Sequence, residues 1–159
     1  ISQELDFFGI NFYTRAVYRH NLNSRFEEVQ LPDVARTDIG WEVYPQAFTD
    51  LLVDLNTRYK LPPIYITENG AACADVMVDG EVNDEQRVRY LNGHINAVND
   101  AIEAGVDIRG YFAWSLMDNF EWAEGYSKRF GLCYVDYETQ TRTIKRSGKA
   151  YKALLESRS

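Results

Sequence analysis

The sequence predicts an α/β fold in which a parallel β-sheet is covered by helices. Three dense apolar runs have the character of strands buried on both faces, which is typical of parallel sheets. Two segments with apolar residues at helical spacing separate these runs, and a third follows near the end of the chain. Alternation of strand and helix requires right-handed crossovers and places the helices outside the sheet.

The first strand is expected within Glu4–Tyr13, where the sequence E-L-D-F-F-G-I-N-F-Y is dense in apolar and aromatic residues. The polar stretch from Arg19 to Gly40 lacks periodicity. Pro45 stands where a helix can begin, because its fixed φ suits the first helical turn. This helix is expected to end near Tyr59. Its apolar stripe comprises Ala47, Phe48, Leu51, Leu52 and Leu55.

The second strand, Ile64–Thr67, follows a Pro-Pro pair that breaks the chain before it. The small, polar and glycine-containing segment from Ala71 to Glu81 is expected to be a mobile loop over a site at the strand end. A second helix follows, capped by Asp84 and stopped by Gly105. Its apolar stripe comprises Val88, Leu91, Ile95, Val98 and Ile102.

The third strand is expected within Arg109–Met117, which reads R-G-Y-F-A-W-S-L-M. Two short β-like runs, Gly131–Asp136 and Arg142–Lys145, flank a polar turn at Glu138–Thr141 and predict a hairpin outside the main sheet. A final helix begins near Ser147. The length of 159 residues suits one domain. The pattern leaves open a complete small α/β layer or three consecutive units of an eight-stranded barrel.

The composition favours a protein with a neutral ligand. A formal net charge of −7 argues against nucleic acid as a partner, because binding phosphates requires clustered Lys and Arg. No apolar run approaches the length of a membrane span and no leader opens the chain, so we expect a soluble protein without a membrane partner. The one basic cluster is interpreted as a solvated face beside the last helix. It comprises Arg142, Lys145, Arg146 and Lys149.

Neither cysteine nor histidine usage indicates metal or redox chemistry. Cys73 and Cys133 lack Cys-x-x-Cys spacing, and we expect free thiols in a reducing, cytoplasmic compartment. His20 and His94 are far apart in sequence and have no partner at ligand spacing. We therefore expect no metal and no cofactor.

Candidate catalytic residues follow two of the predicted strands. Glu68, in I-T-E-N-G, comes directly after the second strand, at the end where parallel α/β folds keep reactive groups. Asn11 and Tyr13 occupy alternate positions of the first strand and so share one face. The Tyr13 hydroxyl could hold a carboxylate ionised and correctly turned. An ordinary loop glutamate and an ordinary buried tyrosine are the open alternatives.

Candidate binding residues follow the third strand. Trp114 ends that strand, and its loop supplies Phe120-Glu121-Trp122 and then Phe130. Rings that stack on sugar faces, with a carboxylate that accepts from two hydroxyl groups, suit a carbohydrate site. The same aromatic residues could equally belong to the core.

Several motifs together carry a resemblance to a known family. They are D-F-F-G-I-N-F-Y-T, G-W-E-V-Y-P, I-Y-I-T-E-N-G, G-Y-F-A-W-S-L-M-D-N-F-E-W and G-Y-S-K-R-F-G-L-C-Y-V-D-Y. In this order they resemble the last third of a family 1 glycoside hydrolase of the β-glucosidase type. The resemblance implies a (β/α)8 TIM barrel. Residues 1–159 would be the C-terminal portion of that one barrel domain, with its last three strand–helix units, a small hairpin and a terminal helix.

The resemblance also implies roles for single residues. Glu68 matches the catalytic nucleophile, and Tyr13 matches the tyrosine that orients it. Members that act on 6-phosphorylated glycosides carry a Ser and a Lys near Glu121, so the carboxylate here favours a neutral glycone. The substrate-binding residues implied are Asn11 of the strand-end cluster, Trp114 under the glycone, Glu121 on sugar hydroxyls, and Trp122 and Phe130 beside them.

The implied activity is retaining hydrolysis of terminal non-phosphorylated β-D-glycosides or oligosaccharides by double displacement. That mechanism needs a second carboxyl group, which the family keeps in an Asn-Glu-Pro motif absent from this sequence. Asp118 and Glu124 match no acid/base position, so the chain alone is expected to be inactive. Open sheet edges predict a complementary N-terminal barrel fragment or self-association. The alternatives are a carbohydrate-binding fragment without catalysis and a structural or engineered half-barrel.

Overall fold

The computed structural model describes residues 3–157 and contains one parallel sheet of three strands, in the order β1-β4-β7. These strands are β1 (Phe8–Asn11), β4 (Ile64–Asn69) and β7 (Ile108–Ala113), so all three predicted strands are confirmed. The first and third strands are shorter than predicted. Residues 4–7 and 12–13 of the first apolar run, and residues 114–117 of the third, lie outside the strands. Residues 1–2 and 158–159 of the predicted domain lie outside the described residues.

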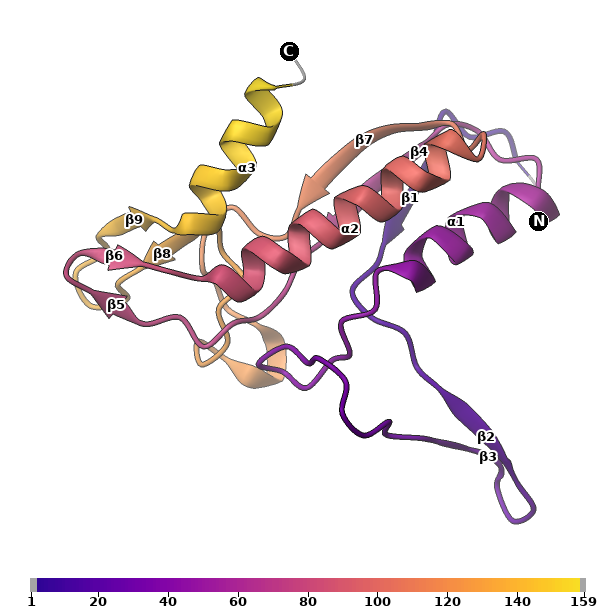
Figure 1. The fold of residues 1–159 in the computed structure, drawn as a ribbon, viewed down its shortest axis with the longest axis horizontal. Helices are drawn as coiled ribbons and strands as arrows, with labels where there is room; N and C mark the ends of the chain where they lie inside the picture. The colour runs from indigo at the N-terminus through magenta and orange to yellow at the C-terminus, as the bar shows by residue number, and fades with distance from the viewer. Residues whose placement is uncertain (1–2, 158–159) are drawn as a thin grey trace.

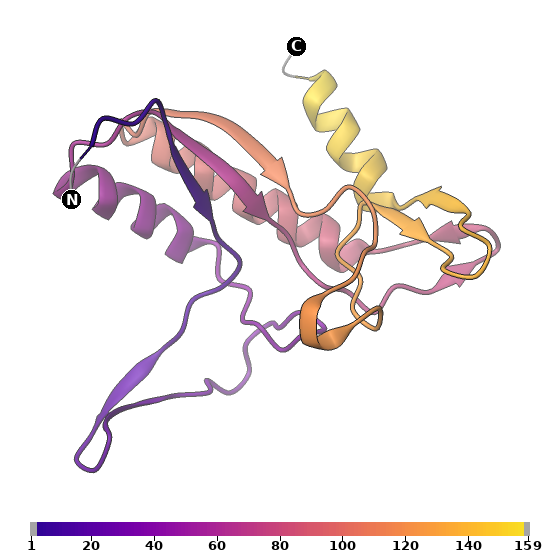
Figure 2. The ribbon, with the colours of Figure 1, turned by 180° about the vertical axis from the view of Figure 1, so that it is seen from behind.

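The two long helices cover one face of this sheet (Figures 1 and 2). They are α1 (Gln46–Arg58) and α2 (Glu85–Glu103), and they begin and end close to the predicted positions. Alternate strand residues such as Ile10, Ile64 and Ile66 point toward the helices and are buried. The main core is formed by these residues with Phe12, Phe48, Leu52, Ala97, Val98, Ala101 and Val106.

The opposite face of the sheet is not covered by any described element. Figure 2 shows the strands in front of the two helices, with nothing packed on them. Phe7 and Phe112 expose 53% and 57% of their surfaces there, beside a cavity of about 440 Å³ that Tyr65 also lines. Three strands curved around an open apolar face form part of a barrel rather than a complete layer.

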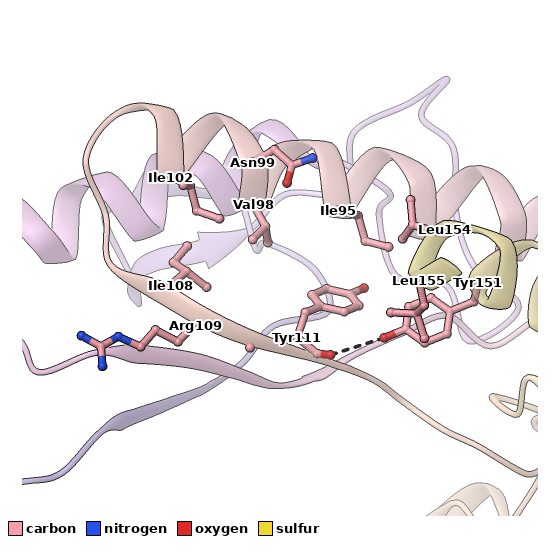
Figure 3. Close-up of a pocket in the computed structure, with 11 residues that line it drawn as sticks. Ile95, Val98, Asn99, Ile102, Ile108, Arg109, Tyr111, Tyr151, Leu154 and Leu155 are labelled. Atoms are coloured by element: carbon pink, nitrogen blue, oxygen red, sulfur yellow. Dashed lines mark hydrogen bonds between the residues drawn. The ribbon is translucent and has the colours of Figure 1, made fainter. Parts of the chain in front are cut away.

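The outer edge of β7 is also open. The last helix, α3 (Arg146–Glu156), stands beside this edge without closing it. A groove of about 250 Å³ runs between α2, β7 and α3, and Figure 3 shows Val98, Tyr111 and Leu154 around it. The Tyr151 hydroxyl donates to the Tyr111 carbonyl across the groove at 3.3 Å. The sheet therefore offers unpaired backbone groups next to an apolar groove.

The polar stretch from Arg19 to Gly40, which lacks periodicity, contributes most of an antiparallel hairpin. Its strands are β2 (Tyr18–Asn21) and β3 (Arg25–Glu28), and it projects away from the body of the chain (Figure 1). Both faces of this hairpin are largely exposed, so no alternation of apolar and polar residues marks its strands.

The segment from Ala71 to Glu81, predicted to be a mobile loop, is largely packed and paired. Its first three residues are buried, and the Cys73 amide donates to the Arg129 carbonyl at 3.1 Å. Its second half forms the hairpin of β5 (Met77–Val78) and β6 (Glu81–Val82). Asp79 and Gly80 both have positive φ, which is the conformation that a tight hairpin turn requires.

The C-terminal hairpin and helix are confirmed. β8 (Cys133–Val135) pairs with β9 (Arg142–Ile144), and α3 follows directly. A short 3₁₀ helix, η1 (Trp122–Glu124), lies in the loop after β7.

Two predictions about charged residues fail because these residues are recruited into a buried ionic cluster. Lys145 was expected on a solvated face but is fully buried, with Nζ 2.6 Å from Asp75 and 2.7 Å from Asp118. Asp84 precedes α2 but makes no side-chain capping bond, and it accepts instead from Ser147 and Arg87. The ionic cluster consists of Asp75, Asp84, Arg87, Asp118, Arg129 and Lys145.

Candidate active site at the carboxyl end of the sheet

The carboxyl ends of β1 and β4 bring Tyr13 and Glu68 into direct contact. The Tyr13 hydroxyl donates to Glu68 Oε2 at 2.6 Å. Burial, followed by the hydrogen bond and charge of Glu68 and by the charge of Glu121, raises the pKa of the Tyr13 phenol well above its usual range. The Tyr13 hydroxyl therefore keeps its proton at neutral pH. It can donate a hydrogen bond to the carboxylate of Glu68, which only accepts.

A β-bulge determines where Glu68 points. Ile10 lies opposite Ile66, but the next residue, Asn11, lies opposite Glu68, so Thr67 is the extra residue of the ladder. Such an insertion bends the strand and re-aims the side chains beside it. The Thr67 hydroxyl donates to Asn11 Oδ1 at 2.6 Å, which fixes the bulge from the neighbouring strand. Asn11 is thus placed beside Glu68, with its side chain amide bound to the bulge.

Gly70 permits the loop after β7 to approach Glu68. A Cβ atom at Gly70 would lie 1.8 Å from the Trp114 carbonyl oxygen, which is a severe collision with backbone. The Trp114 amide donates to the Asn69 carbonyl at 2.8 Å. The glycine that follows Glu68 and Asn69 therefore allows Trp114 to come next to the carboxylate-bearing strand end.

Aromatic rings surround Tyr13. Phe130, which is buried, meets it edge-on with ring centroids 6.1 Å apart. Trp41 lies 5.4 Å from Tyr13 and 6.1 Å from Phe130. Trp41 was not among the predicted site residues, although the G-W-E-V-Y-P motif that contains it contributed to the family resemblance.

Glu121 provides a second carboxylate within electrostatic reach of the pair. Burial, and then the negative charges of Glu68 and Glu124, raise its pKa above the usual range. The charge of Glu68 therefore acts on the Glu121 carboxyl group. Trp122 exposes 82% of its surface on η1, and within residues 3–157 its indole makes no ring contact. Of the predicted residues, Tyr13, Glu68 and Asn11 lie together at the strand ends, and Phe130 lies against Tyr13. The Trp114 backbone lies beside Asn69 and Gly70, and the Trp122 side chain faces solvent.

Metal-ligand groups and membrane-spanning helices are both absent from the described residues. Within them, no group of three or more His, Cys, Asp or Glu side chains could hold a metal ion. No helix in the same part of the chain is long and apolar enough to cross a membrane. Cys73 and Cys133 are both free thiols, and both are buried.

The fold and the site define a partial (β/α)8 barrel with acidic and aromatic residues at the carboxyl ends of its strands, where such barrels keep their active sites. The profile of Glycosyl hydrolase family 1 matches residues 1–159. The chain therefore belongs to glycosyl hydrolase family 1.

Curated relatives agree with this assignment. The chain is 51% identical to a beta-glucosidase of Agrobacterium sp. over 97% of its own length, and 44% identical to beta-glucosidase A of Thermotoga maritima over 99%. A 6-phospho-beta-galactosidase of Streptococcus pneumoniae is 46% identical over 84% of the chain. The alignments span only 35%, 36% and 29% of those relatives.

Solved structures show the same relation. The family 1 β-glucosidase from Thermotoga maritima superposes with a TM-score of 0.93 at 44% identity, covering 96% of this chain and 35% of that one. Its complex with glucoimidazole gives the same TM-score at 45% identity. The chain therefore has the fold of about a third of a family 1 barrel, which confirms the predicted partial barrel.

Proposed function

We propose that this chain supplies the nucleophile half of a retaining β-glucosidase active site, with Glu68 as the nucleophile. The observation that carries the proposal is the 2.6 Å hydrogen bond from Tyr13 to Glu68 Oε2 at the carboxyl ends of adjacent parallel strands. Membership of the family and similarity to β-glucosidases support it. Because the chain spans about a third of those relatives, the activity is proposed for the assembled barrel.

In this mechanism Tyr13 holds one carboxylate oxygen, and Glu68 Oε1 attacks the anomeric carbon. The new C–O bond forms as the glycosidic C–O bond breaks, and the departing oxygen takes a proton from the acid/base group. Water then displaces Glu68 and gives its proton to the same group, which restores the enzyme. The product retains the β configuration because both displacements invert the anomeric centre.

The acid/base group is proposed to come from a complementary part of the barrel. A retaining enzyme needs a carboxyl group about 5 Å from the nucleophile. Asp118 does not suit this role, because Arg129 and Lys145 hold both of its oxygens and it is buried. Glu124 is exposed beyond Glu121, and Glu121 is assigned to the sugar. The uncovered sheet face and the open edges of β1 and β7 are the surfaces on which the complementary part would pack.

The sugar is proposed to bind among Trp114, Glu121, Trp122, Phe130 and Asn11. Glu121 would accept hydrogen bonds from two sugar hydroxyls, and the exposed Trp122 indole is available for stacking on a ring face. A phosphate at this point would face the carboxylates of both Glu121 and Glu68. We therefore propose a non-phosphorylated β-glucoside as the substrate, in contrast to the pneumococcal relative, whose name refers to a 6-phosphorylated sugar.

Turnover by the assembled barrel tests the proposal. The chain is mixed with a complementary N-terminal barrel segment from a family 1 relative, and hydrolysis of nitrophenyl β-glucoside and its 6-phosphate is followed. We expect hydrolysis of the neutral substrate, preferred over the phosphate, and a loss of at least about 10³-fold for Glu68→Gln. Lys149→Gln, on the exposed surface, is the control. A folded complex that binds glucoside without turnover would instead indicate a carbohydrate-binding protein.

A further inference from the structure

Three side chains form a hydrogen-bonded group on the helix side of the proposed site. The fully buried Asn69 amide donates to the Phe12 carbonyl at 2.7 Å and to the Tyr90 hydroxyl at 3.1 Å. Its Oδ1 accepts from the Tyr111 hydroxyl at 2.5 Å. The Tyr90 hydroxyl, from helix α2, donates in turn to the Tyr13 carbonyl at 2.8 Å. This group therefore joins β4, β7 and α2 to the backbone that carries Tyr13.

The group replaces ladder bonds that the sheet no longer supplies. The last backbone bond between β1 and β4 runs from the Phe12 amide to the Glu68 carbonyl at 3.0 Å. The bulge at Thr67 and a second register shift between Ile66 and Asn69 leave the strand ends irregular. The carbonyl oxygens of Phe12 and Tyr13 lie beyond the ladder, and a buried carbonyl without a donor is costly. Asn69 and Tyr90 provide the missing donors.

Every side-chain donor in the group is committed to one arrangement. Both amide protons of Asn69 are used, each tyrosine hydroxyl donates once, and the Tyr90 oxygen accepts from Asn69. Burial raises the pKa of both Tyr90 and Tyr111, so both hydroxyls keep their protons. A network without a spare donor has one stable geometry rather than several.

Tyr90 itself is held rigidly. It is 1% exposed and stacks on His94 with ring centroids 3.8 Å apart. One turn earlier on α2, the buried Arg87 donates to the Ala71 carbonyl at 3.1 Å, directly after the strand that carries Glu68. Helix α2 is thus fixed to the end of β4, and Tyr90 transmits that position to Tyr13.

We propose that Tyr90 is a positioning residue for the Tyr13–Glu68 pair. Its hydroxyl fixes the Tyr13 carbonyl, so that the phenol of the same residue meets Glu68 at hydrogen-bonding distance. The catalytic part of this inference rests on the proposed function, because it requires that Tyr13 and Glu68 perform catalysis. The geometric part, that removal of the Tyr90 hydroxyl loosens the bond between Tyr13 and Glu68, holds for the chain itself.

Proton NMR of the 159-residue chain tests the geometric part without any activity. The Tyr13 hydroxyl proton should give a downfield, slowly exchanging resonance, assigned by its loss in Tyr13→Phe. Tyr90→Phe should broaden this resonance or move it upfield. Tyr137→Phe is the matched control, because it also removes a hydroxyl that donates to a backbone carbonyl but lies outside the Asn69 group. An unchanged resonance in Tyr90→Phe would overturn the proposal.

Kinetics of the complemented barrel test the catalytic part. Tyr90→Phe should lower kcat about fivefold to tenfold, as expected for the loss of about one net hydrogen bond, with KM changed less than about twofold. In Tyr13→Phe the same change should add less than about twofold, because the phenol it positions is gone. Equal effects in both backgrounds would show that Tyr90 is purely structural.

The positioning role can still be tested if Tyr90→Phe does not fold or if the complemented barrel is inactive. Should Tyr90→Phe not fold, Tyr111→Phe replaces it, since it frees Asn69 Oδ1 and should weaken the same resonance to a smaller extent. Should the complemented wild type show no turnover, the proposed function fails, and the NMR comparison alone decides the positioning role.

Discussion

Consecutive side chains of a β-strand normally point to opposite faces, and the bulge at Thr67 breaks this rule next to Glu68. Without the extra residue, Thr67 rather than Glu68 would lie opposite Asn11. The glutamate would then turn toward the helices, where Asn69 and Ile66 are buried. One inserted residue therefore decides whether the carboxylate faces the sheet's open side or the core.

His94 is a titratable residue inside the described core. It is fully buried beside Phe12, Phe48 and Tyr90, and burial lowers its pKa to about 4 from the ordinary value of 6.5. Nδ1 lies 2.9 Å from the Tyr90 carbonyl, and Nε2 has no partner among the described residues. The neutral ring with a proton on Nδ1 satisfies this environment, and the charged ring does not.

We predict that the folded chain loses stability as the pH falls from 6.5 to 4. The unfolded chain binds a proton at His94 in this interval and the folded chain does not, so the loss accumulates toward about 3 kcal/mol, at about 1.4 kcal/mol for each pH unit. Urea unfolding of the wild type and of His94→Phe across this range measures it. The variant should show a smaller pH dependence, and His20→Asn, an exposed control, should match the wild type. Parallel curves for wild type and His94→Phe would contradict the prediction.

At the scale of elements, the ionic cluster joins the segments that follow β4 and β7 to α2 and to β9. Lys145, at the end of β9, is shared by Asp75 and Asp118, while Arg87 of α2 also pairs with Asp75 at 2.8 Å. Each of these side chains is almost completely buried. A buried ion pair is a weak source of stability as a whole, but the loss of one partner leaves an uncompensated charge.

We predict that Lys145→Met lowers the free energy of unfolding by about 3–5 kcal/mol, because Asp75 and Asp118 lose a shared cation in the interior. Lys149→Met is the control, since its pair with Glu81 is exposed and should contribute less than about 1 kcal/mol. Urea denaturation of the three proteins measures both values. Similar midpoints for the two variants would show that the cluster does not hold these segments.

The elements that could be predicted from the sequence are those whose apolar residues follow a regular strand or helix pattern. The three apolar strands and the amphipathic helices carry their pattern locally. Their positions on the predicted strands made Glu68 and Tyr13 candidates, and the family resemblance assigned them roles. The β2–β3 hairpin has two exposed faces and so leaves no pattern. Lys145 looks like its exposed neighbours, while its partners are 70 and 27 residues away in sequence. Trp41, Asn69 and Tyr90 likewise join the site through contacts between distant segments.

At the scale of the whole molecule, the open sheet face determines what the chain can do alone. A barrel interior is filled by side chains from all of its strands, and here three strands leave Phe7 and Phe112 exposed. The free edge of β7 and the groove beside it extend this surface toward α3 (Figure 3). This exposed apolar surface therefore lies where the other strands of a closed barrel would pack.

We predict that Phe112→Asp prevents association with the complementary barrel segment, because it places a charge on the face that should become the barrel interior. Phe26→Asp, at a similarly exposed ring on the projecting hairpin, is the matched control and should leave association unchanged. Sedimentation velocity of each mixture measures the fraction of 1:1 complex. Normal assembly of Phe112→Asp would place the interface elsewhere.

Covalent trapping tests the central claim most directly. The complemented barrel is incubated with a 2-deoxy-2-fluoro-glucoside that carries a good leaving group, because fluorine slows both displacements and the leaving group keeps the first one fast enough for the intermediate to accumulate. Digestion and mass spectrometry should locate one fluoroglucosyl group on Glu68, and Glu68→Gln should remain unlabelled. A label on another residue, or no label in a complex that hydrolyses the unmodified glucoside, would contradict Glu68 as the nucleophile.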